Sequence, residues 1–580
     1  QPRRIKVGSK VYAIYDIVNG KPIYRTTDNI ASAKATKTDE LHPGGGLGLN
    51  LEGLNMNIGV WDEESVRGTH DEFKDDQAIP QSRVIYPEFP GLFFGPISDH
   101  ATHVAGTLLA KGADADAKGM APKATLRSYD WEFDDDEALT EAGNGLLISN
   151  HSYGVPILNS GGTQQVPSQN IGAYTSAART WDDVVYNAPF YLPVMSAGNG
   201  GTDTYPGGLA NGFDKLTGNK TAKNTLIVAN ADPFLNAAGE ISFLAINSSS
   251  SQGPTDDFRI KPDLSGDGTA VYSPFSGSDS QYSTISGTSM ASPNVAGSLL
   301  LLQEYYNQLN SNFMRASTLK GLVCHTAMDD NTKIGPDPIF GWGLLNAEDA
   351  AVLIKDDNDG TALIREITLN DSGSYTYQFS ADAGSKLSAT ICWTDPAGNV
   401  SSSPGNVLTS RLINDLDLRL EDSNSTVFTP WKLDNSNVTG AAVKGDNDVD
   451  NIERIDIASP VAGNYTLTVT HKGSLTNGAQ MFSVIISGAN LTLNTKDNAF
   501  SSLSVWPVPA STKINITYKA LPQASKLSLY DINGSLVFKD VLPVSISNDY
   551  VINTSEFAKG IYFLNIASGS SKFTKKIIIK

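Results

Sequence analysis

The sequence predicts a multidomain chain, in which an α/β domain with a mainly parallel sheet is followed by two all-β sandwich domains. With 580 residues the chain is too long for one hydrophobic core, so two to four domains are expected. Over residues 47–355 short apolar strands alternate with helices of small residues, which is the pattern of a parallel sheet. After residue 360 the pattern changes to alternating polar and apolar residues with closely spaced turns, which is typical of β-sandwiches.

Three segments support the α/β domain directly. Asn57–Trp61 and Leu226–Asn230 are short apolar runs that suit buried strands, and Thr102–Ala110 has the small-residue composition of a packed helix. Residues 1–46 precede this domain as an extension, which ends in the breaker cluster Pro43–Gly46. We therefore expect the α/β domain to begin after this loop.

The all-β part of the chain divides at a polar segment. We expect one sandwich at residues 361–491 and a second at residues 503–580, joined by the polar linker Thr492–Ser502. Tyr465–Thr470 shows the alternation of a half-buried strand. The acidic run Asp356–Gly360 does not follow the spacing of a calcium-binding loop, so we interpret it as a turn between domains.

Composition excludes several classes of partner. The net charge of −19 would repel the phosphates of nucleic acid. No apolar stretch is long enough to span a bilayer. Cys324 and Cys392 lie in different predicted domains, so we expect two buried thiols rather than a disulfide. The sequence therefore predicts a protein that neither binds nucleic acid nor crosses a membrane.

The most specific motif in the chain is Gly287–Gly297, which reads GTSMASPNVAG. Gly287 permits a close approach to Ser289, and the small apolar residues that follow suit a buried helix whose positive N-terminal end faces that serine. Pro293 fits only near the start of such a helix, where its missing N–H costs little. The motif resembles the nucleophile segment of the subtilisin-like serine peptidases (subtilases, family S8), which implies that Ser289 is the nucleophile.

Two further motifs resemble the general base and the orienting acid of the same family. In Asp99–Thr107 the resemblance implies that His100 is the base. Ile58–Asp62 places a carboxylate at the carboxyl end of a buried strand, where the active sites of open α/β sheets lie. The predicted catalytic triad is therefore Asp62, His100 and Ser289.

The residues after the predicted acid depart from the family pattern. The family continues with a hydroxyl residue and glycine, whereas this chain has Glu63 and Glu64. Downstream, His70–Phe73 resembles the element that follows the family's aspartate. Because of the departure we keep a second interpretation open, in which the chain is a catalytically inactive cell-surface binding protein with the subtilase fold.

A third interpretation is a zinc hydrolase that uses the histidines. His70, His100 and His103 are candidate ligands, and the last two are three positions apart in the sequence. No glutamate follows this pair in the register of a metalloprotease helix. The resemblance instead implies that His103 packs behind the catalytic histidine.

Two segments resemble the parts of the family that bind substrate. Val194–Asn199 resembles the oxyanion element, which makes Asn199 a side-chain donor beside the backbone N–H of Ser289. Asn150–Gly154 resembles the segment that pairs with extended substrate and lines the first specificity pocket, opposite residues 196–198. The predicted substrate-binding residues are Ser152, Tyr153, Gly154, Ser196, Ala197 and Gly198.

The first all-β region resembles the P-domain-like β-sandwich that follows the catalytic domain in one branch of subtilisin-like alkaline peptidases. Ile391–Pro396, Leu412–Leu418 and Asn447–Glu453 carry this resemblance. Crowded carboxylates in these strings suit Ca²⁺, which prefers oxygen ligands, whereas the alternative is a solvated acidic rim. The candidate calcium ligands are Asp395, Asp415, Asp417, Asp448, Asp450 and Glu453.

The C-terminal region resembles the sorting domain of the type IX secretion system of Bacteroidetes. Val505–Ala510, Leu529–Ser535 and Gly560–Leu564 carry the resemblance, although the family usually has Asn where this chain has Val508. The resemblance implies recognition by the type IX machinery. The alternative is a small carbohydrate- or surface-binding module, but the sequence shows no aromatic platform for a sugar.

Together the motifs predict a secreted serine endopeptidase that hydrolyses proteins or peptides through an acyl-enzyme on Ser289. We expect no cofactor to take part in the chemistry, and structural Ca²⁺ is the one candidate ion. We also expect a monomer at an extracellular or cell-surface location.

Overall fold

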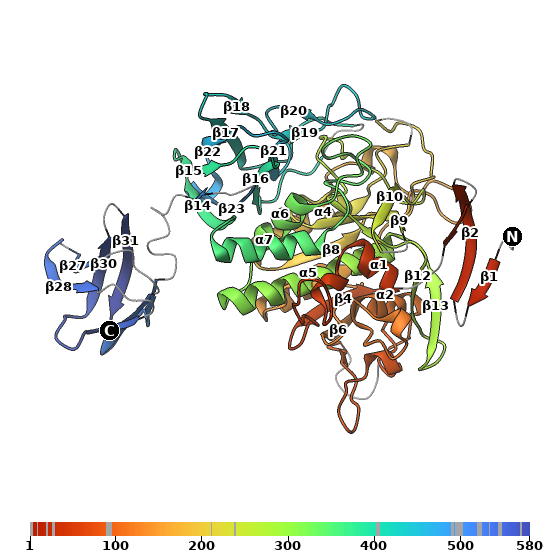
Figure 1. The fold of residues 1–580 in the computed structure, drawn as a ribbon, viewed down its shortest axis with the longest axis horizontal. Helices are drawn as coiled ribbons and strands as arrows, with labels where there is room; N and C mark the ends of the chain where they lie inside the picture. The colour runs from red at the N-terminus through yellow and green to blue at the C-terminus, as the bar shows by residue number, and fades with distance from the viewer. Residues whose placement is uncertain are drawn as a thin grey trace. The chain divides into compact units, whose positions relative to one another are not determined.

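A computed structural model of the chain forms two compact units (Figure 1). The first unit comprises Gln1–Thr376 with Ala381–Leu491, and the second comprises Tyr377–Ser380 with Thr492–Lys580. The structure describes residues 4–7, 10–18, 21–25, 29–88, 95–209, 212–236, 239–401, 406–488, 492–493, 503–518, 525–532, 534–542, 548–568 and 571–580.

The first unit is built on an eight-stranded sheet with the order β10-β9-β8-β7-β4-β6-β5, in which β11 also pairs with β9. Every pairing in it is parallel except that of β10 with β9. This confirms the predicted mainly parallel sheet. The strands are β4 (Asn57–Asp62), β5 (Val84–Ile85), β6 (Thr125–Asp130), β7 (Ile148–His151), β8 (Leu192–Ser196), β9 (Leu226–Leu235), β10 (Ile241–Ile246) and β11 (Leu264–Asp267).

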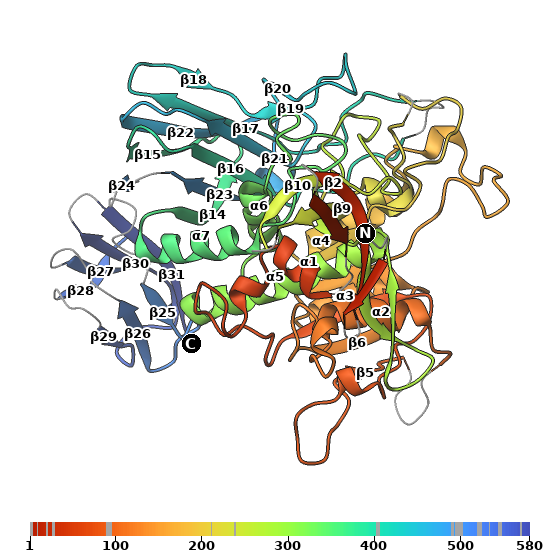
Figure 2. The same cartoon turned by 45° about the vertical axis from the view of Figure 1, so that its right-hand side comes forward.

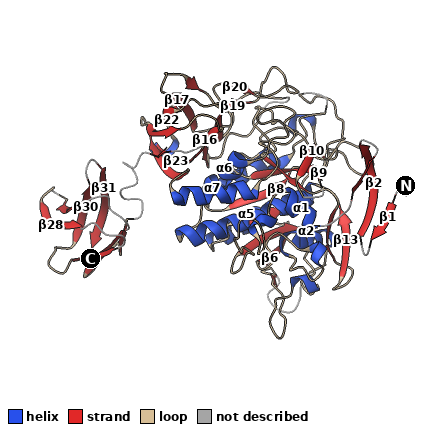
Figure 3. Cartoon of the chain, viewed as in Figure 1, coloured by secondary structure: helices blue, strands red, loops and turns tan. Residues whose placement is uncertain are grey.

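Helices pack against this sheet, and the longest of them, α5, lies in the core against β7, β8, β9 and β11 (Figure 3). Its residues from Thr288 to Tyr305 are all buried. A Cβ atom at Gly268 would come within 2.4 Å of the Gly287 carbonyl oxygen, so a glycine there lets the sheet approach the start of α5. The helices are α1 (Asn29–Ala35), α2 (Asp99–Leu109), α3 (Asp134–Gly143), α4 (Ser176–Asn187), α5 (Thr288–Asn310), α6 (Ala316–Thr326) and α7 (Ala347–Asp359).

Short elements complete the α/β part. An antiparallel sheet of three strands, β1 (Arg4–Val7), β2 (Lys10–Val18) and β3 (Lys21–Arg25), belongs to the predicted N-terminal extension. A hairpin is formed by β12 (Val271–Phe275) and β13 (Gln281–Ile285). The short 3-10 helices of the first unit are η1 (Asp39–Leu41), η2 (Asp71–Phe73), η3 (Ala115–Ala117), η4 (Ser168–Asn170), η5 (Gly218–Thr221) and η6 (Thr476–Gly478).

Antiparallel strands follow, next to α6 and α7 (Figure 2), as predicted for an all-β region. α6 packs on β16 and β23, and Cys324 on α6 shares one core with Cys392 on β16. Both thiols are free and buried, which confirms the prediction of two thiols. The strands are β14 (Leu363–Asn370), β16 (Leu387–Trp393), β17 (Asp415–Asp422), β18 (Val427–Phe428), β19 (Trp431–Lys432), β20 (Val443–Lys444), β21 (Ile452–Ile457), β22 (Gly463–Lys472) and β23 (Ala479–Ser487).

The acidic run at residues 356–359 is not a turn, because it forms the last turn of α7. The Asp357 carboxylate accepts hydrogen bonds from the Ile364 N–H at 2.8 Å and from Arg365 Nη1 at 2.7 Å, which anchors the helix end to β14. Gly360 then ends the helix in the left-handed region, at φ +79°. The interpretation as a turn was wrong because these partners follow the helix in the next strand.

The second unit is also all-β, as predicted. β15 (Tyr375–Ala381) pairs with β24 (Thr492–Leu493) through Phe379 and Ser380. The remaining strands form sheets of three and four strands around one apolar core. Residues 494–502 of the predicted linker lie outside the described residues. The strands are β25 (Ser504–Trp506), β26 (Lys513–Tyr518), β27 (Ser525–Asp531), β28 (Leu536–Leu542), β29 (Asn548–Asn553), β30 (Gly560–Ser568) and β31 (Ser571–Ile579).

Candidate active site

The predicted acid and base are joined by a hydrogen bond. β4 ends at Asp62 and α2 begins at Asp99, which brings His100 Nδ1 to 2.7 Å from Asp62 Oδ1. Since a carboxylate oxygen accepts, Nδ1 donates and Nε2 of the neutral ring is left as an acceptor. The Asp62 side chain is 1% exposed and that of His100 is 32% exposed. A buried carboxylate therefore orients an accessible imidazole.

Neighbouring charge raises the pKa of His100. Burial alone would lower it, but the hydrogen bond to Asp62 and the negative charges of Asp62 and Glu63 outweigh that effect. The imidazolium form is thus stabilised beside these carboxylates. That is the form a general base takes after it has accepted a proton.

The unexpected Glu63 contributes to this arrangement. Its N–H donates to Asp62 Oδ1 at 2.8 Å, and its carboxylate accepts from Ser98 Oγ at 2.5 Å. Ser98 is the N-cap of α2, where its side chain accepts from the Ala101 N–H. Glu63 therefore connects the end of β4 to the start of the helix that carries His100. Asp62 Oδ2 has no hydrogen-bond partner among the described residues.

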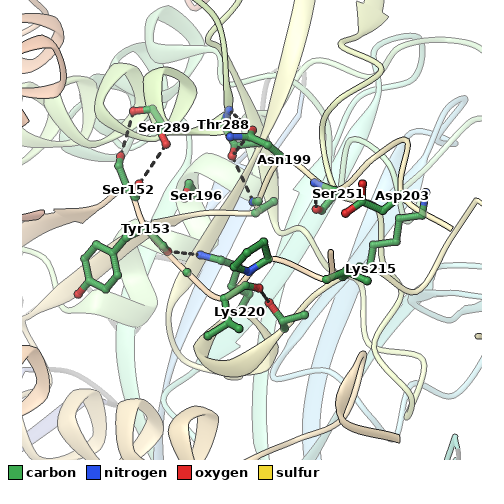
Figure 4. A pocket seen from close by; sticks show the side chains of 18 of the residues that line it. Ser152, Tyr153, Ser196, Asn199, Asp203, Lys215, Lys220, Ser251, Thr288 and Ser289 are labelled. Carbon is green, nitrogen blue, oxygen red and sulfur yellow. Dashed lines mark hydrogen bonds between the residues drawn. The ribbon is translucent and has the colours of Figure 1, made fainter. Parts of the chain in front are cut away.

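The predicted nucleophile lies in the first turn of α5 (Figure 4). Ser289 Oγ donates to the carbonyl of Ser152 at 3.0 Å, and Ser152 Oγ donates to the carbonyl of Ser289 at 2.9 Å. A hydroxyl has a single proton to donate. In this arrangement the Ser289 proton is engaged by the Ser152 carbonyl, so the hydroxyl must turn away from that carbonyl before His100 can accept the proton.

Thr288 fixes the orientation of Asn199. The Thr288 N–H and hydroxyl both donate to Asn199 Oδ1 at 2.9 Å (Figure 4). Since a backbone N–H can only donate, the atom it faces is the amide oxygen, and Nδ2 is left free as a donor. Sequence reasoning missed Thr288, although its hydroxyl stands directly before the serine in the most specific motif.

A cavity of about 370 Å³ opens beside these residues. Ser289, Thr288 and Asn199 lie on its wall, together with all the predicted substrate-binding residues, Ser152, Tyr153, Gly154, Ser196, Ala197 and Gly198. A Cβ atom at Gly154 would come within 2.5 Å of Lys220 Cε, so a larger residue there would displace the end of the lysine side chain. The structure therefore gathers the predicted substrate-binding residues around one cavity that contains the predicted nucleophile.

The same cavity has charged residues that sequence reasoning missed. Lys220, Lys215 and Asp203 lie on its wall (Figure 4). The Lys220 side chain is buried, and its Nζ donates to the Tyr153 carbonyl at 2.7 Å. Burial lowers the pKa of Lys220 to about 7. No sequence motif marks this lysine, since it reaches the cavity from η5.

The other two candidate zinc ligands, His70 and His103, are engaged by backbone carbonyls. His103 Nε2 lies 3.1 Å from the Val271 oxygen and His70 Nε2 lies 2.9 Å from the Gln281 oxygen. A carbonyl only accepts, so these nitrogens carry protons and are not metal ligands. Within the described part of the chain, no group of three or more His, Cys, Asp or Glu could hold a metal ion. The zinc interpretation has no site in this structure.

Two of the candidate calcium ligands surround a lysine instead. Lys472 Nζ lies 3.2 Å from Asp415 Oδ2, 3.1 Å from Asp417 Oδ1 and 3.0 Å from Asp446 Oδ2. Arg419 also pairs with Asp417 and Asp446. The side chains of Lys472 and Arg419 thus already pair with the carboxylates of the cluster. The arrangement does not fit a bound cation.

The remaining candidates have separate partners. Asp395 accepts from the Asn414 N–H at 2.8 Å, Asp450 from the Ile260 N–H at 2.8 Å and Glu453 from the Leu418 N–H at 2.6 Å. Asp448 accepts from Ser410 Oγ only through its backbone carbonyl. The structure thus does not gather the six residues around one centre. Apart from that of Asp448, their carboxylates instead accept hydrogen bonds from backbone N–H groups, as Asp395 does, or pair with lysine and arginine side chains, as Asp415 and Asp417 do.

Comparison with known proteins matches two parts of the chain. Residues 58–343 match the subtilase family, and residues 504–580 match the secretion system C-terminal sorting domain. Subtilisin DY of Bacillus licheniformis is 25% identical over 254 residues, and Subtilisin Savinase of Lederbergia lenta is 28% identical over 255 residues. Each match covers 43% of this chain and 77% of the relative. Among the described residues, no helix combines the length and apolar character that a membrane span requires.

Proposed function

Residues 58–343 belong to the subtilase family of serine peptidases, and on this premise we propose that the chain is a secreted serine endopeptidase. The observation that carries the proposal is the 2.7 Å hydrogen bond between His100 and Asp62, at the carboxyl end of the parallel strand β4. Ser289 lies on the wall of a cavity of about 370 Å³. Subtilisin DY and Subtilisin Savinase are similar to this part of the chain.

The geometry supports acyl transfer in two halves. Ser289 Oγ, after rotating away from Ser152, attacks the peptide carbonyl carbon, and its proton passes to His100 Nε2. Asp62 holds the ring and stabilises the imidazolium. The tetrahedral intermediate collapses as His100 returns the proton to the leaving amine, which breaks the C–N bond. Water then attacks the acyl-enzyme, with His100 as the base, and releases Ser289.

Two donors would stabilise the oxygen anion of each tetrahedral intermediate. One is Asn199 Nδ2, which the contact with Thr288 leaves free. The other is the backbone N–H of Ser289, in the first turn of α5, where a helix supplies no acceptor of its own. Each such donor typically contributes 10²–10³-fold to turnover, by the order of magnitude found for oxyanion donors.

The C-terminal domain supports export by the type IX secretion system. We propose that its machinery recognises residues 504–580 and delivers the peptidase to the cell surface or the medium, where proteins and peptides are its substrates. A chain lacking residues 504–580 should then remain inside the cell while it keeps peptidase activity in a lysate. Secretion of the truncated chain would contradict this part of the proposal.

The peptidase activity is tested with a fluorophosphonate probe on the full chain. We expect the probe to label the wild type and to leave Ser289→Ala unlabelled, with loss of peptide hydrolysis in that variant. Ser292→Ala is the matched control, because Ser292 lies in the same helix and donates to Asn150 Oδ1. A folded wild-type chain that is not labelled would favour the inactive binding protein.

A further inference from the structure

Two buried carboxylates face one another next to Gly172, away from the catalytic groups. Asp214 is 0% exposed and Asp256 is 3% exposed. Asp214 Oδ1 and both carboxylate oxygens of Asp256 have no hydrogen-bond partner among the described residues. A buried oxygen that has lost water without gaining a partner costs free energy, and the cost is greater for a charged group. This pair therefore needs a compensating positive charge or a proton.

The unpartnered oxygens converge on one point. A Cβ atom built on Gly172 would lie 2.0 Å from Asp214 Oδ1 and 2.6 Å from Asp256 Oδ1. Ca²⁺ binds oxygen ligands at about 2.3–2.6 Å. A cation cannot occupy the Cβ position itself, which is one covalent bond from the Gly172 Cα, but two oxygens within 2.6 Å of one point lie close enough together for a single Ca²⁺ beside Gly172 to contact both. Any side chain at Gly172, whose φ is +74°, would fill that space.

Hydrogen bonds hold the Asp214 carboxylate and the backbone of both aspartates in place. Asp214 Oδ2 accepts from the Leu209 N–H at 3.2 Å, and it lies 3.0 Å from the Tyr205 hydroxyl, which also contacts the Asp214 backbone carbonyl. The Asp256 N–H donates to the Gly172 carbonyl at 2.9 Å, and the Asp214 N–H donates to Gly253 at 2.8 Å. The convergence is therefore fixed by the fold, not by flexible side chains alone.

The charges nearby do not neutralise the pair. Burial, together with the negative charges of Asp214 and Asp257, raises the pKa of Asp256 to about 8. The Val407 N–H and Arg411 oppose this rise, but neither forms a hydrogen bond of ordinary geometry with the Asp256 carboxylate. Burial also raises the pKa of Asp214 to about 6. Crowded, buried carboxylate oxygens without hydrogen-bond partners are the ligands that a hard cation stabilises.

We propose that Asp214 and Asp256 bind one Ca²⁺ ion between their unpartnered oxygens. Neutral oxygens would complete the coordination shell of the ion. Asn406 is a candidate to provide one, because its Nδ2 donates to the Gly207 carbonyl in the loop before Asp214 and its Oδ1 has no partner among the described residues. The ion would connect two segments of the cavity wall. Lys215 and Thr217 follow Asp214, and Ser251 precedes Asp256, and all three line the cavity that contains Ser289.

Calcium binding is tested on the full chain in a Ser289→Ala background, which prevents self-digestion and makes the result independent of the proposed peptidase activity. We expect atomic emission to find one Ca²⁺ per chain after dialysis against micromolar CaCl₂. We also expect CaCl₂ to raise the Tm by several degrees relative to EGTA, since a ligand that binds only the native state stabilises it. MgCl₂ in place of CaCl₂ tests whether the smaller ion suffices.

The variant Asp256→Asn separates a cation from a shared proton. With a calcium site, Asp256→Asn loses the bound ion and the Tm rise in CaCl₂, and Asp214→Asn does the same. The control Asp415→Asn, which alters the cluster around Lys472, keeps both. Without a site, the parent binds no calcium, its Tm does not respond to CaCl₂, and Asp256→Asn raises the Tm in EGTA because it removes repulsion. That second set of results would overturn the proposal.

Discussion

Thr288 and Asn199 form a fixed pair, in which the threonine N–H and hydroxyl both donate to the asparagine Oδ1 at 2.9 Å. The two residues lie 89 positions apart, one at the start of α5 and the other after β8. The Thr288 hydroxyl oxygen also accepts from the Gly198 N–H at 3.2 Å. The amide of Asn199 is therefore oriented before substrate binds, with Nδ2 as the free donor.

Thr288→Val should lower kcat more than it raises KM. The backbone N–H of residue 288 still donates to Asn199, but the hydroxyl bond is lost, so Nδ2 is less well aimed at the oxyanion. We expect kcat to fall about fivefold, since one neutral hydrogen bond contributes about 1 kcal/mol. Steady-state kinetics on one peptide substrate measures both constants.

Thr288→Ser is the control for this prediction, because serine keeps the hydroxyl and loses only a methyl group. Its kcat should remain within about twofold of the wild type, as one hydrogen bond is unchanged. Equal losses of kcat in Thr288→Val and Thr288→Ser would show that the methyl packing, and not the hydrogen bond, supports catalysis.

Asp62→Asn should remove most of the activity without unfolding the chain. The amide can no longer accept in the same way from His100 Nδ1, so the ring loses both its orientation and the partner of its imidazolium form. We expect kcat to fall by about 10⁴, the order found when an orienting aspartate is replaced by asparagine. Circular dichroism should show an unchanged fold. Undiminished turnover would mean that another carboxylate orients His100.

The pH dependence of kcat/KM should respond to Glu63. The imidazolium form of His100 cannot accept the serine proton, so activity is lost as the pH falls through the His100 pKa. Because that pKa is raised, the inflection should lie above the ordinary value of about 6.5. Glu63→Gln removes a negative charge that raises the pKa, so the inflection should move to lower pH. An unmoved inflection would contradict the role of Glu63.

Sequence reasoning could find residues of the candidate active site because their constraints are local. The helix that begins at Thr288 needs small residues where it enters the core, and Ser289 stands among them in one continuous string. The same holds for His100 at the start of α2. The parallel sheet follows from the alternation of apolar strands and helices along the chain. Local patterns therefore predicted the fold class and the residues that gather at the cavity.

Contacts between distant segments could not be predicted in this way. Nothing near Asn199 indicates that Thr288 holds it. The carboxylates of Asp256 and Asp214 lie close together beside Gly172, and these three residues are far apart in the sequence. For Asp415 the sequence instead predicted a partner that the structure replaces. Its carboxylate was predicted to bind calcium, but it lies against Lys472 of the neighbouring strand β22. Side-chain pairs across a sheet depend on register, which the sequence does not show.

Lys220 brings an ammonium group to the cavity without a carboxylate to neutralise it. In the described residues it has no salt bridge, and its Nζ donates to the Tyr153 carbonyl. We predict that a substrate with Glu directly before the scissile bond is hydrolysed faster than one with Lys there. In Lys220→Met the ratio of the two kcat/KM values should fall about tenfold or more, because a hydrogen bond to a charged group contributes about 1.5–3 kcal/mol.

The preference should also depend on pH. Since burial lowers the pKa of Lys220 to about 7, its charge is present at pH 6 and is lost as the pH rises through 7. The preference for Glu over the uncharged Gln should therefore decline from pH 6 to pH 8 in the wild type and stay constant in Lys220→Met. Lys215→Met is the matched control, since Lys215 lines the same cavity but donates to the Gly201 carbonyl. A Glu-to-Gln ratio that is the same in the wild type and in Lys220→Met at every pH would show that this ammonium group does not contact the substrate side chain.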